Sequence, residues 1–327
     1  MHSSASFIIN MYTICAVLVT FHLVSIQSIQ IPYDTVVCFG DSHSDTGNVY
    51  NLTKFQWPLV PPYYQGRFSN GPIWIEKLNI PTLINYAYGS ATTDNYLITG
   101  VTALNTIVPG VRQQVSMYKN VTNLTQINFN RTLYVIWGGA NDYFFNNYLL
   151  PSAVIGSLTD SINDLIQLGA KHFLILNQPP FQAIPYATNL NLSSYLSILT
   201  LAHNNNLSAT IQSYRSNYST RVFHFYDVYS LVINILNNTS AYGINNTRNC
   251  WSISTGVING ICSTPESYLF VDEYHFTTRV HQFIADNVRQ LFSVSSRSGK
   301  CSQSIAAMFC CICICIVLRW KEFYLFN

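Results

Sequence analysis

The chain has 327 residues, of which 49% are hydrophobic and only 9% are charged, and its formal net charge is +2. This much apolar material can bury the core of one large domain or of two smaller ones. The small net charge, without a basic stripe, argues against nucleic acid as a partner, and the many asparagine, serine, threonine and tyrosine residues suit an extracellular protein that meets neutral ligands.

The N-terminus predicts a secretory signal peptide over residues 1–28. An apolar run from Phe7 to Phe21 ends in polar residues around Ser25–Ser28. Only His2 precedes this run as a basic residue, so an uncleaved anchor stays an alternative. Ten Asn-x-Ser/Thr sequons favour a secreted, N-glycosylated product. They begin at Asn51, Asn120, Asn123, Asn130, Asn191, Asn206, Asn217, Asn237, Asn238 and Asn245.

The central part of the chain alternates short apolar runs with helical patterns. Strands are predicted at Val36–Phe39, Leu83–Ala87, Thr132–Trp137, His172–Leu176 and Arg221–Tyr226. Helices are predicted near Asp45 and at Pro72–Leu78, Val108–Asn120, Ser152–Leu168, Ser193–Tyr218, Asp227–Leu236 and Phe276–Phe292, with a long loop at Asn237–Pro265. This alternation predicts an α/β fold with a parallel sheet covered on both faces. We expect a single domain over residues 31–294.

The cysteines indicate one disulfide and no metal site. Cys250 and Cys262 flank a loop rich in glycine, serine and asparagine and are the best candidates for a disulfide in a secreted protein. Cys38 lies inside the first strand and is expected to be a buried free thiol. No Cys-x-x-Cys pair faces a second pair at the spacing of zinc ligands, so we expect neither a metal nor another cofactor.

The C-terminal tail, residues 295–327, contains a short hydrophobic segment. Ile305–Leu318 is apolar and rich in cysteine, and Arg319 and Lys321 follow it. The segment is shorter than the roughly 20 residues that a spanning helix needs. Membrane association through this segment, a lipid-anchor signal and a tail without fixed structure are left open as alternatives.

Polar residues follow three of the predicted strands. Ser42 comes after the first strand, Gly89 after the second and Asn141 after the third. The carboxyl ends of parallel strands meet at one edge of the sheet, where ligands bind. A serine on a strand-to-helix turn has backbone N–H groups near its oxygen that can hold an oxyanion. A Gly-Asp-Ser turn also has purely structural uses, and Ser44 stands where the Gly-x-Ser-x-Gly elbow needs glycine.

A late turn contains the other candidate groups. Asp272 and His275 are three residues apart, so one turn can place both side chains together. The Asp272 carboxylate can then accept from the imidazole and fix its tautomer, which leaves the other ring nitrogen to take the proton of Ser42. The chain order would be serine, aspartate, histidine.

Four separated blocks together resemble the SGNH (GDSL-type) serine hydrolases. They are Phe39–Asn48, Asn85–Ala91, Gly138–Asp142 and Asp272–His275. The resemblance implies a flavodoxin-like three-layer α/β/α sandwich around a five-stranded parallel sheet.

The same resemblance assigns roles to individual residues. Ser42 would be the nucleophile, and His275 the general base oriented by Asp272. The oxyanion hole would comprise the backbone N–H groups of Ser42 and Gly89 and the side chain of Asn141.

Two positions depart from the family pattern. His43 replaces the leucine of the family's short name and is expected to be a surface histidine outside the proton relay. Ser90 stands where many relatives have a second glycine, which should narrow backbone freedom without removing the Gly89 donor.

The loop Gly66–Gly71 with Trp74 is similar to a subgroup of fungal carbohydrate acetylesterases, bacterial lysophospholipase-like enzymes and plant GDSL lipases, and most similar to the acetylesterases. The aromatic residues of Trp57–Pro72 either line a substrate groove or pack on the core. We therefore expect a secreted, monomeric serine esterase acting on a small acyl ester, in particular acetyl groups on plant-wall saccharides. The alternatives are an extracellular lipase or phospholipase and a non-catalytic glycan-binding protein on the same fold.

Overall fold

The computed structural model describes residues 31–254 and 257–292. Within it, Pro32–Leu291 forms one compact unit. The predicted signal peptide and the apolar segment of residues 305–318 lie outside the described residues. In the part of the chain that is described, no helix combines the length and the hydropathy needed to cross a bilayer.

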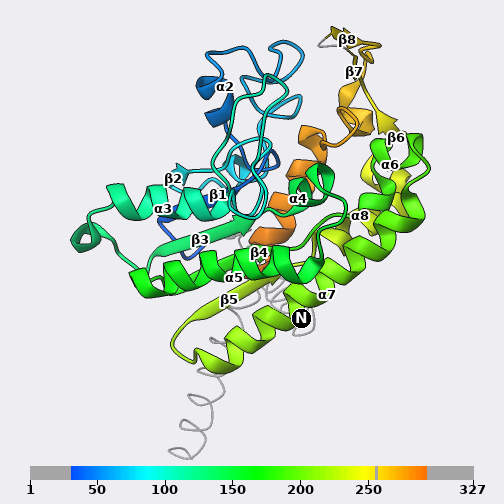
Figure 1. The fold of residues 1–327 in the computed structure, drawn as a ribbon. Coiled ribbons are helices and arrows are strands. Elements are labelled where there is room, and N and C mark those ends of the chain that lie inside the picture. The colour runs from blue at the N-terminus through cyan, green and yellow to red at the C-terminus, as the bar shows by residue number, and fades with distance from the viewer. Residues whose placement is uncertain (1–30, 255–256, 293–327) are drawn as a thin grey trace, which may run out of the picture. The chain divides into compact units, whose positions relative to one another are not determined.

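Five parallel strands form the central sheet in the order β2-β1-β3-β4-β5 (Figure 1). They are β1 (Thr35–Gly40), β2 (Thr82–Asn85), β3 (Thr132–Trp137), β4 (His172–Leu176) and β5 (Val222–Tyr226). Strand β1 lies between β2 and β3 and pairs with β3 from Thr35 opposite Thr132 to Gly40 opposite Trp137. The ends of the two strands are therefore adjacent, and the predicted α/β sandwich with a five-stranded parallel sheet is confirmed.

Helices cover both faces of this sheet. Helices α3 (Val111–Val121), α5 (Pro151–Leu168) and α7 (Ser193–Asn217) pack side by side on one face, and α8 (Val228–Asn237) and the helical residues 278–292 lie on the other (Figure 1). The core under the first three helices takes alternate strand residues, namely Val37, Phe39, Tyr134, Ile136, Phe173 and Ile175. Because both faces are buried, the central strands are almost continuously apolar.

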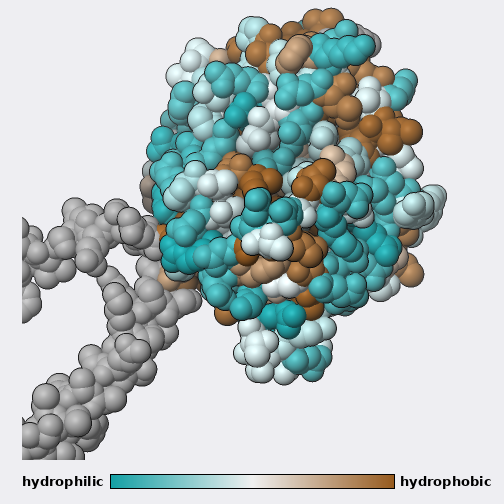
Figure 2. Space-filling model, turned by 90° about the vertical axis from the view of Figure 1, so that its left-hand side faces the viewer, coloured by the Kyte–Doolittle hydropathy of each residue, from teal (hydrophilic) through white to brown (hydrophobic). Residues whose placement is uncertain are grey.

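Shorter elements connect these layers. The short helices are α2 (Asn48–Leu52), α4 (Ala140–Phe145) and α6 (Pro185–Asn189). Short 3-10 turns cover Glu76–Leu78, Leu124–Gln126, Phe181–Ala183, Thr239–Tyr242 and Pro265–Ser267. Additional strands are β6 (Asn246–Asn249), β7 (Ser252–Ser254), β8 (Val257–Asn259) and β9 (Tyr268–Phe270). On the side shown in Figure 2, hydrophobic residues interrupt a largely hydrophilic surface in several separate patches.

Three predicted elements differ from the structure. The helix predicted over Pro72–Leu78 is only a 3-10 turn at Glu76–Leu78, because Asn79 follows it in the left-handed conformation, with φ of 53°, and ends the helical backbone. The helix predicted near Asp45 begins at Asn48. The predicted loop Asn237–Pro265 contains β6, β7 and β8, and within it Cys250 and Cys262 form a disulfide.

Three histidines of the unit are held in their neutral form by burial. Burial lowers the pKa of His203 to about 3 and that of His224 to about 4, and it lowers the pKa of His281 well below its usual value. In the unfolded chain each takes a proton near pH 6.5. Two buried carboxyls act in the opposite direction, because burial raises the pKa of Asp45 to about 6 and that of Asp142 to about 7.

These shifts predict how the free energy of unfolding depends on pH. Below pH 6.5 the unfolded chain gains up to three protons at these histidines that the folded protein does not bind, whereas the folded protein gains up to two protons at Asp45 and Asp142. The unfolded state therefore binds more protons, and we expect the free energy of unfolding to fall by about 2 kcal/mol between pH 7 and pH 5. Urea denaturation across this range measures the slope, which should become shallower in His203→Gln. A protein that becomes more stable towards pH 5 would contradict this.

Candidate active site

The turn after β1 is shaped by a close approach of two strands. A Cβ atom on Gly40 would lie 2.2 Å from the carbonyl oxygen of Trp137, so only glycine fits at the end of β1. Ser42 follows two residues later, and its side chain lies at the edge of a cavity. The sequence thus places a serine where the backbone turns out of the sheet.

Ser42, His275 and Asp272 meet in one hydrogen-bonded row. The Oγ atom of Ser42 lies 2.8 Å from Nε2 of His275. The Nδ1 atom of His275 lies 2.7 Å from Oδ2 and 2.9 Å from Oδ1 of Asp272. The structure therefore brings together the three residues that the sequence placed in a proton relay, in the geometry that lets a carboxylate orient an imidazole towards a hydroxyl.

The Asp272 carboxylate is buried and well supplied with donors. Its Oδ1 accepts from the backbone N–H groups of Tyr274 and His275, at 2.8 and 2.7 Å, and its Oδ2 accepts from the hydroxyl of Tyr63. Burial by itself raises the pKa of Asp272, but His275 and these donors outweigh burial and leave the pKa below its usual value. Asp272 is therefore an anion at neutral pH and accepts the Nδ1 proton, which leaves Nε2 as the acceptor that faces Ser42.

The predicted oxyanion donor Gly89 is engaged elsewhere. Its N–H donates to Oδ2 of Asp45 at 2.7 Å, and its Cα packs so closely on the Phe68 ring that a Cβ atom would lie 2.3 Å from it. The role predicted for the Gly89 N–H therefore does not fit its hydrogen bonding in the structure. The next residue, Ser90, lines the cavity with φ of 64°. Within the described part of the chain, the Ser90 N–H makes no hydrogen bond.

The two other residues predicted to supply oxyanion donors line the same cavity. The Ser42 N–H has no hydrogen-bond partner among the described residues. Asn141, in α4, lines the cavity and uses one Nδ2 hydrogen to donate to the Ala91 carbonyl at 2.9 Å, which leaves the second hydrogen available. Ser42 and Asn141 therefore line one cavity, and their role as oxyanion donors stays a prediction.

Asp142 fixes α4 against the loop that carries Ser90. Its carboxylate accepts from the N–H of Thr93 at 2.9 Å and from the Thr93 hydroxyl at 2.6 Å. Asp142 is fully buried, so these two hydrogen bonds are shielded from water. Asn141 and Ser90 are thereby held in a constant relation to each other.

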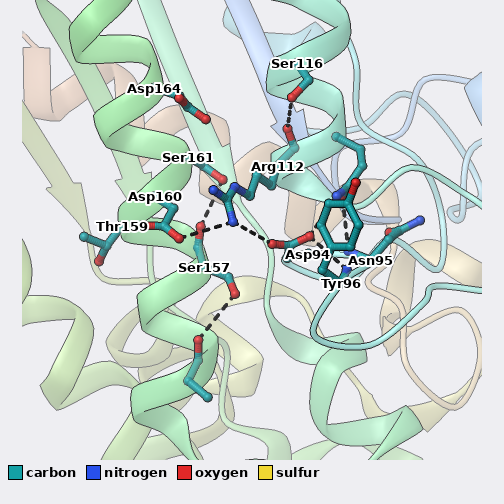
Figure 3. A network of polar contacts seen from close by, with 12 residues as sticks. Asp94, Asn95, Tyr96, Arg112, Ser116, Ser157, Thr159, Asp160, Ser161 and Asp164 are labelled. Atoms are coloured by element: carbon teal, nitrogen blue, oxygen red, sulfur yellow. Dashed lines mark hydrogen bonds and ion pairs between the residues drawn. The ribbon is translucent and has the colours of Figure 1, made fainter.

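An ion-pair network secures the same loop from outside. Arg112 of α3 reaches Asp94 at 3.0 Å and Asp160 of α5 at 3.3 Å (Figure 3). Asp94 also accepts from the Tyr96 N–H and from the Gln113 side chain. The loop after β2 is therefore tied to two helices of the scaffold, which pre-organises the donors it carries.

The cavity beside Ser42 has a volume of about 350 Å³. Most of its wall is apolar, and the wall includes Trp57, Phe68, Val101, Phe144, Phe145 and Phe181. The aromatic residues of Trp57–Pro72 were expected either to line a substrate groove or to pack on the core, and the structure shows residues of both kinds. Trp57 and Phe68 line the cavity, whereas the buried Tyr63 faces Asp272.

His43 is buried, so the prediction of a surface histidine is wrong. Its ring lies 4.9 Å from that of Trp137, 5.7 Å from that of His275 and 5.4 Å from that of Phe276, and only 9% of the residue is exposed. The turn after β1 folds beneath the late turn of residues 271–276, which encloses the imidazole. His43 makes no hydrogen bond to Ser42, His275 or Asp272 in the described structure and stays outside the relay.

No cluster of three histidine, cysteine or acidic side chains within residues 31–254 and 257–292 is arranged to hold a metal ion. Cys38 is a buried free cysteine, as its strand position indicated.

The chain matches the GDSL-like lipase/acylhydrolase family over residues 36–288. It is 28% identical to a phosphatidylcholine-sterol acyltransferase of Aeromonas hydrophila, over 66% of this chain and 65% of the relative. A thermolabile hemolysin of Vibrio parahaemolyticus is also 28% identical, over 77% and 62%. The chain thus spans just under two thirds of the length of both bacterial relatives.

An Arabidopsis thaliana GDSL esterase/lipase is 25% identical over 78% of this chain and 88% of its own length. Among solved structures, an aryl esterase of M. smegmatis is 16% identical with a TM-score of 0.46, over 80% of this chain and 99% of the esterase. Since the family match covers well over half of the 327 residues, the chain belongs to the GDSL-like lipase/acylhydrolase family.

Proposed function

We propose that the protein hydrolyses carboxylic esters through an acyl-enzyme on Ser42. The observation that carries this proposal is the unbroken row from Ser42 through His275 to the buried Asp272 at the wall of the cavity. Nε2 of His275 takes the hydroxyl proton as Oγ attacks the ester carbonyl, and the protonated His275 then delivers that proton to the leaving alcohol. Water attacks the acyl-enzyme by the same route in reverse.

Three donors around the cavity would hold the oxyanion of the tetrahedral intermediate. They are the backbone N–H groups of Ser42 and Ser90 and the second Nδ2 hydrogen of Asn141. The backbone N–H groups of Ser42 and Ser90 have no partner within the described residues, so they can donate to the developing charge without giving up an existing hydrogen bond.

The lining of the cavity favours a substrate ester with a hydrophobic acyl chain. Its wall is mostly aromatic and aliphatic, and the lining residue Phe145 is itself 43% exposed at the surface. Exposed apolar groups around a concave site are typical of a surface that receives an apolar partner. One bacterial relative carries phosphatidylcholine and sterol in its name, which agrees with a lipid-type ester.

The acetylated plant-wall saccharide expected from the sequence remains a prediction. The rings of Trp57 and Tyr274 at the cavity could carry a sugar. A panel of p-nitrophenyl esters from acetate to octanoate, acetylated xylan oligosaccharides and phosphatidylcholine vesicles separates the two substrate classes. We expect kcat/KM to rise from the acetate to the longer esters, and a preference for the acetylated oligosaccharides would favour the acetylesterase.

A fluorophosphonate probe separates an enzyme from a silent glycan-binding protein. We expect the folded protein to be labelled stoichiometrically, with the added mass on the peptide that contains Ser42. Folded protein that is neither labelled nor active on any ester of the panel would favour the binding protein.

Secretion with N-glycosylation is also proposed. All ten sequon asparagines are exposed in the structure, so each side chain is accessible to a glycosyltransferase. Treatment of the protein from a eukaryotic secretory host with a peptide N-glycosidase should lower its apparent mass. An unchanged mass would contradict N-glycosylation.

A further inference from the structure

One buried tyrosine contacts the proton relay from outside the cavity. Tyr63 is 2% exposed, is not part of the cavity wall, and donates its hydroxyl proton to Oδ2 of Asp272. Oδ2 is also the oxygen that lies 2.7 Å from Nδ1 of His275. One carboxylate oxygen therefore receives both the phenol and the imidazole.

The Tyr63 ring is fixed by its surroundings. Its backbone N–H donates to the Leu59 carbonyl at 3.2 Å, and its ring meets those of Trp251 and Phe68 edge-on, at 5.2 and 6.0 Å. Phe68 in turn lies 5.0 Å from the His275 ring. A ring packed on these sides cannot swing away from Asp272 without disturbing the core beneath the site.

The chemistry of the phenol makes it a permanent donor. Burial and the neighbouring Asp272 charge both raise the pKa of Tyr63 far above its usual value, so the hydroxyl keeps its proton throughout the working range. A neutral O–H that donates to a carboxylate fixes the plane of the carboxylate and withdraws part of the negative charge of the carboxylate.

We infer that Tyr63 is a positioning residue of the relay: its hydroxyl orients Asp272 and moderates the charge that Asp272 presents to His275. The inference rests on the proposed ester hydrolysis, because it describes how that relay is tuned. Tyr63 does not line the cavity, and its hydroxyl donates to Asp272 alone in the described structure, so the hydroxyl acts through Asp272.

The effect of removing the hydroxyl follows from the shared oxygen. In Tyr63→Phe the full carboxylate charge faces His275, which then holds its proton more tightly. Because the general base must be unprotonated, the acid limb of the kcat/KM profile should move to higher pH. The carboxylate also loses one of its four donors, so kcat should fall about 10- to 100-fold. KM should stay within a few-fold because Tyr63 does not line the cavity.

The other ionisable groups around the relay stay in place in this variant. His43 with Asp41, and His281 behind it, face His275 from the turn after β1 and from residues 278–292. Glu273 and Tyr274 flank Asp272 on its own turn. Since none of them changes, a shifted acid limb reports the Tyr63 hydroxyl.

The experiment compares Tyr63→Phe with Tyr134→Phe. Tyr134 is equally buried and loses a hydrogen bond to Tyr118, but it lies in the core under α3 and makes no hydrogen bond to Ser42, Asp272 or His275 in the described structure. We expect similar losses in Tm for both variants, with a lower kcat and a shifted acid limb only in Tyr63→Phe. A Tyr63→Phe profile with the wild-type midpoint and a kcat within twofold of wild type would overturn the inference.

A second readout does not depend on turnover. The Nδ1 proton of His275, held between His275 and Asp272, should give a downfield proton resonance in histidine-labelled wild-type protein. We expect that resonance to move in Tyr63→Phe and to stay in place in Tyr134→Phe, even if no substrate of the panel is hydrolysed. An unchanged resonance in Tyr63→Phe would refute the role of Tyr63, whereas a wild-type protein without Ser42-dependent turnover would refute the proposed function alone.

Discussion

Ser42→Ala should lower kcat/KM for p-nitrophenyl esters by about 10⁶-fold while the protein stays folded. The hydroxyl of Ser42 is the only hydrogen-bond partner of His275 Nε2 among the described residues. Without it no acyl-enzyme forms, and any residual rate comes from water held beside the oxyanion donors. Initial rates at saturating and limiting ester concentration measure the loss, and circular dichroism checks the fold.

Ser44→Ala is the matched control for this variant. Ser44 lies in the same turn and is buried, but its hydroxyl accepts from the Trp74 indole at 3.2 Å and does not face His275. We expect Ser44→Ala to lose some stability and to keep its activity within about tenfold of wild type, the cost of about one hydrogen bond. If Ser42→Ala instead retained a rate comparable to that of Ser44→Ala, the serine nucleophile would have to be abandoned.

The layers of the fold could be predicted from the sequence because the spacing of its apolar residues indicates which residues are buried. Thr132–Trp137 and His172–Leu176 are continuous apolar runs, and they form β3 and β4 with the predicted bounds. Such strands are buried on both faces, so their pattern has one interpretation. The short pairings β6 with β9 and β7 with β8 could not be predicted, since strands of three or four residues are too short to show a period.

The relay could be predicted for a different reason. Ser42, Asp272 and His275 each sit in a local pattern that carries its own chemistry, and the parallel sheet brings the strand ends to one edge. The local pattern does not determine which backbone N–H group is left unpaired at the proposed oxyanion site. The Asp45 carboxylate, which lies 44 residues away in sequence, accepts a hydrogen bond from the Gly89 N–H, so that among the described residues the Ser90 N–H is the unpaired one of the two.

Contacts between loops that are far apart in the sequence could not be predicted. Tyr63 stands in a loop rich in proline and aromatic residues, and nothing in its spacing points to Asp272, which is 209 residues later. His43 is polar and follows the serine in a turn, which indicated a surface position. His43 is buried because the late turn of residues 271–276 closes over the turn after β1, and Tyr63 is buried because it packs against Trp251 and Val271; neither contact is encoded in the local pattern.

Asp272→Asn should lower kcat by about 10⁴-fold with little change in KM, and the reason lies in the donors around the carboxylate. Oδ1 faces two backbone N–H groups, those of Tyr274 and His275, so the amide oxygen of an asparagine must take that place. The NH₂ group then occupies the position of Oδ2 and donates to Nδ1 of His275. An imidazole that accepts at Nδ1 carries its proton on Nε2.

A proton on Nε2 faces Ser42 and prevents His275 from acting as the general base, so the variant fails through the wrong tautomer rather than through lost shape. Glu273→Gln is the matched control, because it removes a carboxylate charge one residue away and leaves the Asp272 donors intact. We expect that control to stay within about threefold of wild type. Nitrogen chemical shifts of labelled His275 report the tautomer directly, and an Asp272→Asn protein with the proton still on Nδ1 would show that this geometry does not control the relay.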